Sequence, residues 1–91
     1  MRRGPVWMTK SDDAILEVMA ETGAALSLKA LEVNCQIYHN RISYNTAKRR
    51  VPRLLKAGLI RRTGENQRFV LITEKGRKYL RGEYLPEELE E

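Results

Sequence analysis

The stretch ISYNTAKRRVPRLLKAGLI, residues 42–60, constrains the fold more than any other part of this 91-residue chain. Its apolar residues fall on one stripe of an α-helix, the pattern of a helix that packs against a core. These residues are Ala47, Val51, Leu54 and Leu55. From position 41 to position 62 the chain has eight Lys or Arg residues and no Asp or Glu. A helix face that is only solvated normally mixes charges, because like charges three or four residues apart repel. We therefore predict that this face meets an anionic partner.

Ser43 can cap the start of the predicted helix, and Gly58 can end it in a left-handed conformation. Pro52 removes the hydrogen bond to the carbonyl of Lys48, so we expect a kink or a local break there. The side opposite the core stripe carries Asn45, Arg49 and Lys56, flanked by Thr46 and Arg53 on one shoulder and Lys48 on the other. Such a helix suits the major groove of DNA, because it buries its stripe and still presents side chains to bases.

The length and composition fit one small folded domain with a single core. Hydrophobic residues make up 42% of the chain and charged residues 32%. The net charge is +5, which favours an anionic partner. Residues 9–40 carry two Lys against five Asp or Glu, and residues 83–91 carry five Glu and no cation. The positive charge is therefore concentrated in the middle of the chain.

Several classes of protein are disfavoured by what the sequence lacks. It has no apolar run near the roughly 20 residues that span a bilayer and no signal-peptide core, so we expect a cytoplasmic protein without a membrane contact. Cys35 is the single cysteine, which we interpret as a small buried hydrophobe. His39 is the single histidine and has no partners at metal-ligand spacing. We find no catalytic constellation, and we predict no enzyme, no cofactor and no small-molecule substrate.

Two helices are expected before the basic one. Thr9 and Asp12 have the spacing of a capping box, so a first helix should begin near Thr9 and stop at Gly23, with Trp7 packed over it. Its inward residues are Ile15, Leu16 and Met19. Leu26 could form a very short strand. Ser27 can cap a second helix that runs to about residue 34 with Leu28, Leu31 and Cys35 inward. With the basic helix that follows, the second helix makes a helix-turn-helix.

Residues 59–73 contain two β-rich runs joined by a turn, which predicts a hairpin with strands over 59–63 and 68–73. Ile60 and Val70 or their neighbours should face the helices. Arg61, Arg62 and Arg68 rim the turn, so the hairpin could act as a wing against a phosphate backbone or a narrow minor groove. Glu65 at the tip opposes that placement.

Thr73 can cap a last helix, in which Tyr79 and Leu80 face inward and Gly76 allows close backbone packing. The order helix, helix, basic helix, hairpin, helix predicts an α+β, mainly α, winged helix-turn-helix with three main helices, a β-hairpin wing and a C-terminal helix. We expect an N-terminal arm over 1–8, the DNA-binding domain over 9–82 and an acidic tail over 83–91. Arg2 and Arg3 of the arm could touch phosphates or be disordered, and the tail could lie on a second subunit.

The chain also resembles a known family over nearly its whole length. Its segments GPVWMTKSDDAILEVMAETG, ISYNTAKRRVPRLLKAGLIRR and ITEKGRKYLRGEYLPEELEE are similar to small winged-helix proteins related to the haloarchaeal phage phiH repressor. The resemblance implies an archaeal or phage DNA-binding transcriptional regulator. It also implies that the helix with Asn45, Thr46, Lys48, Arg49 and Arg50 enters the major groove. The basic charge departs from the acidic character usual in haloarchaeal proteins.

We expect this protein to bind double-stranded DNA as a homodimer, because one recognition helix reads only a few base pairs. Arg49 could pair with guanine and Asn45 with adenine, whereas Arg53 offers only charge to a phosphate. The residues predicted to bind DNA are Ser43, Tyr44, Asn45, Thr46, Lys48, Arg49, Arg50, Arg53, Arg61, Arg62 and Arg68. A protein-binding adaptor remains an alternative. An RNA-binding winged helix would want more stacking aromatics than Tyr38, Tyr44 and Phe69 near the basic face.

Overall fold

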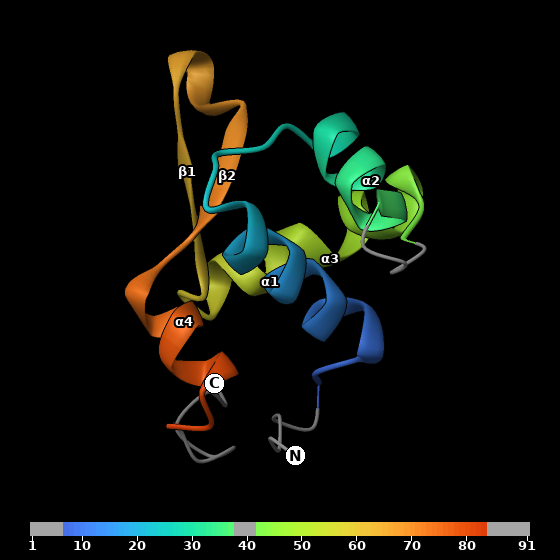
Figure 1. The fold of residues 1–91 in the computed structure, drawn as a ribbon. Coiled ribbons are helices and arrows are strands. Elements are labelled where there is room, and N and C mark those ends of the chain that lie inside the picture. The colour runs from blue at the N-terminus through green and yellow to red at the C-terminus, as the bar shows by residue number, and fades with distance from the viewer. Residues whose placement is uncertain (1–6, 38–41, 84–91) are drawn as a thin grey trace.

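The computed structural model describes residues 7–37 and 42–83. Its elements are α1 (Lys10–Thr22), α2 (Leu28–Ile37), α3 (Tyr44–Lys56), β1 (Ile60–Thr63), β2 (Phe69–Ile72) and α4 (Glu74–Leu80), with a short 3-10 turn (Glu65–Gln67) between the strands. Figure 1 shows the hairpin projecting from a bundle of α1, α2 and α3, with α4 beside the base of the hairpin. The predicted α+β, mainly helical winged helix-turn-helix is confirmed.

Helix α1 is held at its start by the predicted capping box. The Thr9 hydroxyl accepts a hydrogen bond from the backbone N–H of Asp12 at 3.2 Å, and the Asp12 carboxylate accepts one from the backbone N–H of Thr9 at 2.8 Å. Gly23 ends the helix in the left-handed conformation, as expected. The buried residues of α1 include Ile15, Leu16 and Met19.

Helix α2 extends to Ile37, three residues beyond the predicted end near Asn34. The Ser27 hydroxyl caps it by accepting a hydrogen bond from the backbone N–H of Ala30 at 3.1 Å. Immediately before the helix, Leu26 forms the expected short strand contact. Its backbone N–H donates to the carbonyl of Val70 at 2.8 Å and its carbonyl accepts from the Val70 N–H at 2.9 Å. The start of α2 is therefore tied to the hairpin.

Helix α3 begins at the predicted cap, where the Ser43 hydroxyl accepts a hydrogen bond from the backbone N–H of Thr46 at 3.1 Å. A local break at Pro52 is not found, because α3 is one continuous helix to Lys56. The Pro52 ring lies on the exposed side, while Val51 and Leu54 on either side of it are buried in the core. Packing of these two residues therefore keeps the helix intact where local propensity favours an interruption.

Strands β1 and β2 pair antiparallel, with Ile60 opposite Ile72 and Arg62 opposite Val70. Ile60, Val70 and Ile72 are buried, as the alternating pattern predicts for the face toward the helices. At the turn, Gly64 has φ 81°, and a Cβ there would lie 2.5 Å from the Phe69 ring. Only glycine therefore fits, and the Phe69 ring lies across the turn.

Helix α4 is capped by Thr73, whose hydroxyl accepts a hydrogen bond from the Gly76 N–H at 3.1 Å. A Cβ at Gly76 would lie 2.3 Å from the carbonyl oxygen of Leu59, so the predicted close backbone approach is confirmed. Tyr79 is buried in the core, and its hydroxyl donates to the Asp13 carboxylate at 2.7 Å. This bond links α4 to α1.

Some expectations lie outside the described residues: those for Arg2 and Arg3, for Tyr38 and His39, and for the tail after residue 83. Among the described residues, no helix is long and apolar enough to cross a membrane. Cys35 is buried, as predicted, and desolvation raises the pKa of its thiol to about 11.

Candidate nucleic-acid interface

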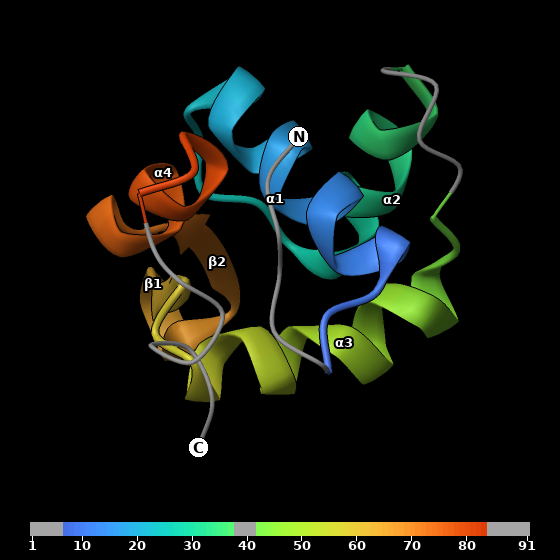
Figure 2. The same ribbon diagram turned by 90° about the horizontal axis from the view of Figure 1, so that it is seen from below.

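The outer side of α3 is exposed along its whole length. Figure 2 shows α3 at one edge of the molecule, with α1 and α2 on its inner side. Ala47, Val51 and Leu54 bury the inner stripe. The exposed residues at the start and along the outer side are Ser43, Tyr44, Asn45, Lys48, Arg49, Pro52 and Lys56. Since α3 has no acidic residue, this outer side presents cations, an amide and a tyrosine without a competing carboxylate of its own.

Asn45 and Arg49 are the two residues of this side best placed to meet base edges. They are four positions apart, so they lie one above the other on the helix surface. Both are exposed. Asn45 belongs to the first turn, the end of a recognition helix that usually reaches bases.

Ser43 and Thr46, both predicted to bind DNA, form hydrogen bonds at the start of α3. The Ser43 hydroxyl accepts from the backbone N–H of Thr46 and donates to the Thr46 hydroxyl at 3.0 Å. Ser43 remains exposed and Thr46 is half-buried. These hydroxyls therefore fix the first turn of α3 and lie beside the face that carries Asn45.

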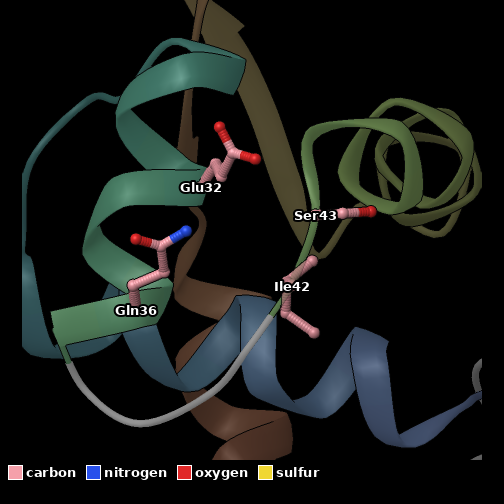
Figure 3. Close-up of a pocket in the computed structure, with 4 residues that line it drawn as sticks. All are labelled: Glu32, Gln36, Ile42 and Ser43. Carbon is pink, nitrogen blue, oxygen red and sulfur yellow. The ribbon is translucent and has the colours of Figure 1, made fainter.

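The first turn of α3 is also tied to α2. The backbone N–H of Tyr44 donates to the Glu32 carboxylate at 3.1 Å, and Lys29 pairs with the same carboxylate at 3.1 Å. The pKa of Glu32 is lowered, first by the hydrogen bond from Lys29 and then by that from Tyr44. Figure 3 shows Glu32 and Gln36 of α2 facing Ile42 and Ser43 across a pocket. This pocket contains the carboxylate that anchors α3.

Arg50 was predicted to bind DNA, but the structure gives its guanidinium partners inside the protein. Its Nε and Nη2 each donate to a carboxylate oxygen of Asp12 at 2.8 Å, and Nη2 also donates to the carbonyl of Trp7 at 3.1 Å. Asp12 is fully buried. The hydrogen bonds to Asp12 raise the pKa of Arg50. Arg50 therefore connects α3 to α1 and to Trp7 in the segment that precedes α1.

Arg53 was predicted to offer charge to a phosphate. Its guanidinium carbon lies 4.3 Å from the centroid of the Trp7 ring, which is a cation–π distance. Arg50 and Arg53 are three residues apart, so Trp7 contacts two neighbouring cations of α3 as well as packing on the core. Arg50 and Arg53 therefore lie on the Trp7 side of α3, apart from the cations of its outer side.

A signal for the Arg50 pair is present in the sequence, although we missed it. Asp12 precedes Ile15, Leu16 and Met19 at helical spacing, so it occupies an inward position of the α1 stripe. A buried carboxylate in that position needs a cation or hydrogen-bond donors as partners. We assigned Asp12 only to the capping box, which it also forms.

The three arginines of the hairpin do not share one surface. Arg62 is opposite Val70, and Arg61 is opposite Leu71. Successive strand residues point to opposite faces, so Arg61 and Arg62 face opposite ways. Because the backbone groups of Val70 bond to Leu26, Arg62 and Val70 form a non-hydrogen-bonded pair of β1 and β2, in which side chains lie close. The Arg62 stem therefore lies over Val70.

A hollow between α3 and the hairpin brings three predicted residues together. Its lining is Leu28, Lys48, Val51, Pro52, Arg62, Arg68 and Val70. We call it the first hollow. Lys48 comes from α3, while Arg62 and Arg68 come from the hairpin. Among the described residues that line it none is acidic, so an anion there would meet three cations over an apolar floor.

A comparison with protein-family models matches residues 1–91, the whole chain, to the model described as winged helix-turn-helix phage repressor. The chain belongs to this phage repressor family. The resemblance seen in the sequence is therefore confirmed. No curated protein and no solved structure matches the chain. Membership of the winged helix-turn-helix phage repressor family indicates a DNA-binding regulator. Among the described residues, no group of three or more His, Cys, Asp or Glu side chains could hold a metal ion.

Proposed function

We propose that this member of the phage repressor family is a sequence-specific transcriptional regulator that binds double-stranded DNA as a homodimer. The proposal rests on one observation. The outer side of α3, a helix without acidic residues, borders a hollow that also contacts the hairpin, and Lys48, Arg62 and Arg68 line this hollow. Helix α3 would enter the major groove, and the hairpin would lie on the adjacent backbone or in the minor groove.

Asn45 and Arg49 are the proposed readers of sequence. Arg49 can form two hydrogen bonds with guanine, and Asn45 can form two with adenine. Each such contact contributes about 1–3 kcal/mol of discrimination against the wrong base. Arg50 and Arg53 are left out of this set, since they contact Asp12 and Trp7.

Lys48, Arg62 and Arg68 are the proposed phosphate contacts. Charge on a phosphate carries no sequence information, so these residues would hold the protein on any duplex. Arg61 faces the other side of the hairpin from Arg62 and serves as a matched control.

The dimer follows from the size of the reading surface. One recognition helix contacts only a few base pairs, and a small module buries little DNA surface by itself. Two copies related by a two-fold axis would read an inverted repeat, with half-sites about 10 base pairs apart or a multiple of that. A monomer bound to a single asymmetric site would contradict this part of the proposal.

The proposal is tested by titrating duplex DNA with protein at several salt concentrations. Three phosphate contacts at about 0.9 each give a slope of log K against log salt of about −2.7 per protomer. Arg62→Ala should reduce this slope by about one, whereas Arg61→Ala should leave it nearly unchanged. A slope near zero for the unmodified protein would refute DNA binding through this face.

A second candidate function is a protein-binding adaptor. The observation that favours it is the exposure of Val33 (47%) and Ile37 (61%), which lie one turn apart on α2. Exposed apolar side chains on one helix face are suited to protein contact. An adaptor would bind its partner with little salt dependence and would not select a duplex sequence.

A further inference from the structure

A second hollow lies next to the first, on the other side of Arg68. Its lining is Ser27, Leu28, Lys29, Tyr44, Arg68 and Phe69. Leu28 and Arg68 line both hollows. The second hollow lies where the start of α2, the first residue of α3 and the first residue of β2 meet. Lys29 lines only the second hollow and Arg62 only the first, so the shared residues Leu28 and Arg68 lie between these two cations.

The second hollow combines two aromatic rings with two cations. Tyr44 is 39% exposed and Phe69 is 38% exposed, so both rings offer apolar surface to a ligand. Phe69 is held against the turn at Gly64. Lys29 and Arg68 supply the charge, and no acidic residue is among the described residues lining this hollow. The chemistry fits a ligand with an anionic group next to an apolar one.

Lys29 is free to leave its present partner at little cost. Its side chain is 76% exposed and pairs with Glu32 three residues away. Such a surface pair contributes only about 0–1 kcal/mol. Glu32 keeps the hydrogen bond from the Tyr44 backbone if Lys29 turns toward another anion. A phosphate can therefore recruit Lys29 without loosening the start of α3.

We propose that the second hollow binds one sugar–phosphate unit of the DNA backbone, adjacent to the backbone contacted by Lys48 and Arg62 at the first hollow. The phosphate would lie between Lys29 and Arg68, and the deoxyribose would lie against Tyr44 and Phe69. This inference rests on the proposed DNA-binding function and adds Lys29 and Phe69 to its interface. In a duplex the bases are stacked inside, so the sugar is the apolar group that the outside of a strand presents to these rings.

Lys29→Met is the first test, because it removes the charge and keeps most of the apolar stem. The slope of log K against log salt should fall by about 0.9. Since the contribution of one such contact vanishes near 1 M salt, the loss of affinity at 0.1 M salt should be about eightfold. The matched control is Lys78→Met on α4, which lies outside both hollows. It should change neither the slope nor the affinity.

A scan of single methylphosphonate substitutions along the bound duplex identifies the phosphate. One neutralised position should weaken binding of the unmodified protein more than binding of Lys29→Met, in which only Arg68 still faces this phosphate. Phe69→Ser should weaken all duplexes by a similar factor without changing the salt slope, because it removes apolar contact and no charge. Circular dichroism shows whether Phe69→Ser is folded. If Phe69→Ser unfolds, the salt slope of Lys29→Met still tests the inference.

The inference is overturned if Lys29→Met keeps both the salt slope and the methylphosphonate profile of the unmodified protein. Specific duplex binding would in that case leave the proposed function intact. It is also overturned if single-stranded DNA binds more tightly than duplex and Phe69→Ser removes that preference, since the rings would then stack on bases. Failure of the unmodified protein to bind any duplex overturns the proposed function as well.

Discussion

Arg50→Ala should lower the free energy of unfolding strongly and should leave the salt dependence of DNA binding nearly unchanged. Arg50 donates two hydrogen bonds to the Asp12 carboxylate and one to the carbonyl of Trp7. Asp12 has no exposed surface, whereas the Arg50 side chain is 26% exposed. Removing Arg50 leaves a buried carboxylate whose remaining described partner is Thr9. Breaking a buried ion pair in this way costs about 3–5 kcal/mol.

We expect the lower end of that range, about 3 kcal/mol, because water can reach the partly exposed site of Arg50 and solvate Asp12. For a domain of this size, each kcal/mol lowers Tm by about 4–8 °C, so Tm should fall by about 12–24 °C. The Tm of Arg50→Lys should lie between those of the unmodified protein and Arg50→Ala, because lysine keeps the charge but cannot form the bidentate hydrogen bonds to Asp12.

The assay is urea denaturation followed by circular dichroism. Fluorescence of Trp7, the single tryptophan, reports separately on the segment that Arg50 holds. The matched control is Arg49→Ala, the neighbouring exposed residue, which should change the free energy of unfolding by at most about 0.5 kcal/mol. A double-mutant cycle of Asp12→Ala and Arg50→Ala gives the coupling energy of the pair.

Two results would refute this reasoning. One is a loss below about 1 kcal/mol for Arg50→Ala, the level of a surface ion pair. The other is a salt slope of DNA binding that Arg50→Ala flattens by a full unit while stability is unchanged. In that case Arg50 would contact DNA, as the family resemblance implied.

Three further predictions concern the hairpin, α4 and the core. Arg62→Ala combined with Arg68→Ala should flatten the salt slope by up to about two units for all duplexes, and an unchanged slope would mean that the hairpin does not touch DNA. Gly76→Ala should lower the free energy of unfolding by about 1–3 kcal/mol, since its Cβ would press on the Leu59 carbonyl 2.3 Å away; an unaffected urea midpoint would contradict the close approach. The pKa of the buried Cys35 thiol is raised from 9.0 to about 11, so the folded state keeps a proton that the unfolded state loses between these values. Stability should therefore fall by up to about 2–3 kcal/mol as the pH rises from 9 to 11, and Cys35→Ala should lack this part of the pH dependence.

Features that depend on neighbouring residues could be predicted from the sequence. The capping box of Thr9 and Asp12 and the caps at Ser43 and Thr73 involve residues only three positions apart. The hairpin strands follow from period-two alternation. The inner stripe of α3 follows from helical spacing. Each of these signals is complete within one short segment, so tertiary structure does not alter it.

The division of the α3 cations could not be predicted in the same way. A helical wheel shows that Arg49, Arg50 and Arg53 avoid the core stripe, but it does not show what each side of the helix meets. Arg50 bonds to Asp12 at a separation of 38 residues and to Trp7 at 43. Only the crossing of α1 and α3 brings these groups together. The continuity of α3 at Pro52 likewise depends on packing that the local sequence does not contain.

The central claim is that the outer side of α3 reads DNA sequence through Arg49. The most direct measurement is selection of bound duplexes from a random DNA pool, carried out with the unmodified protein and with Arg49→Ala. The unmodified protein should select an inverted repeat, and Arg49→Ala should lose preference at one or two positions in each half-site, most plainly at a guanine. An Arg49→Ala protein that selects the same sequence as the unmodified protein, or an unmodified protein that enriches no sequence, would contradict the claim.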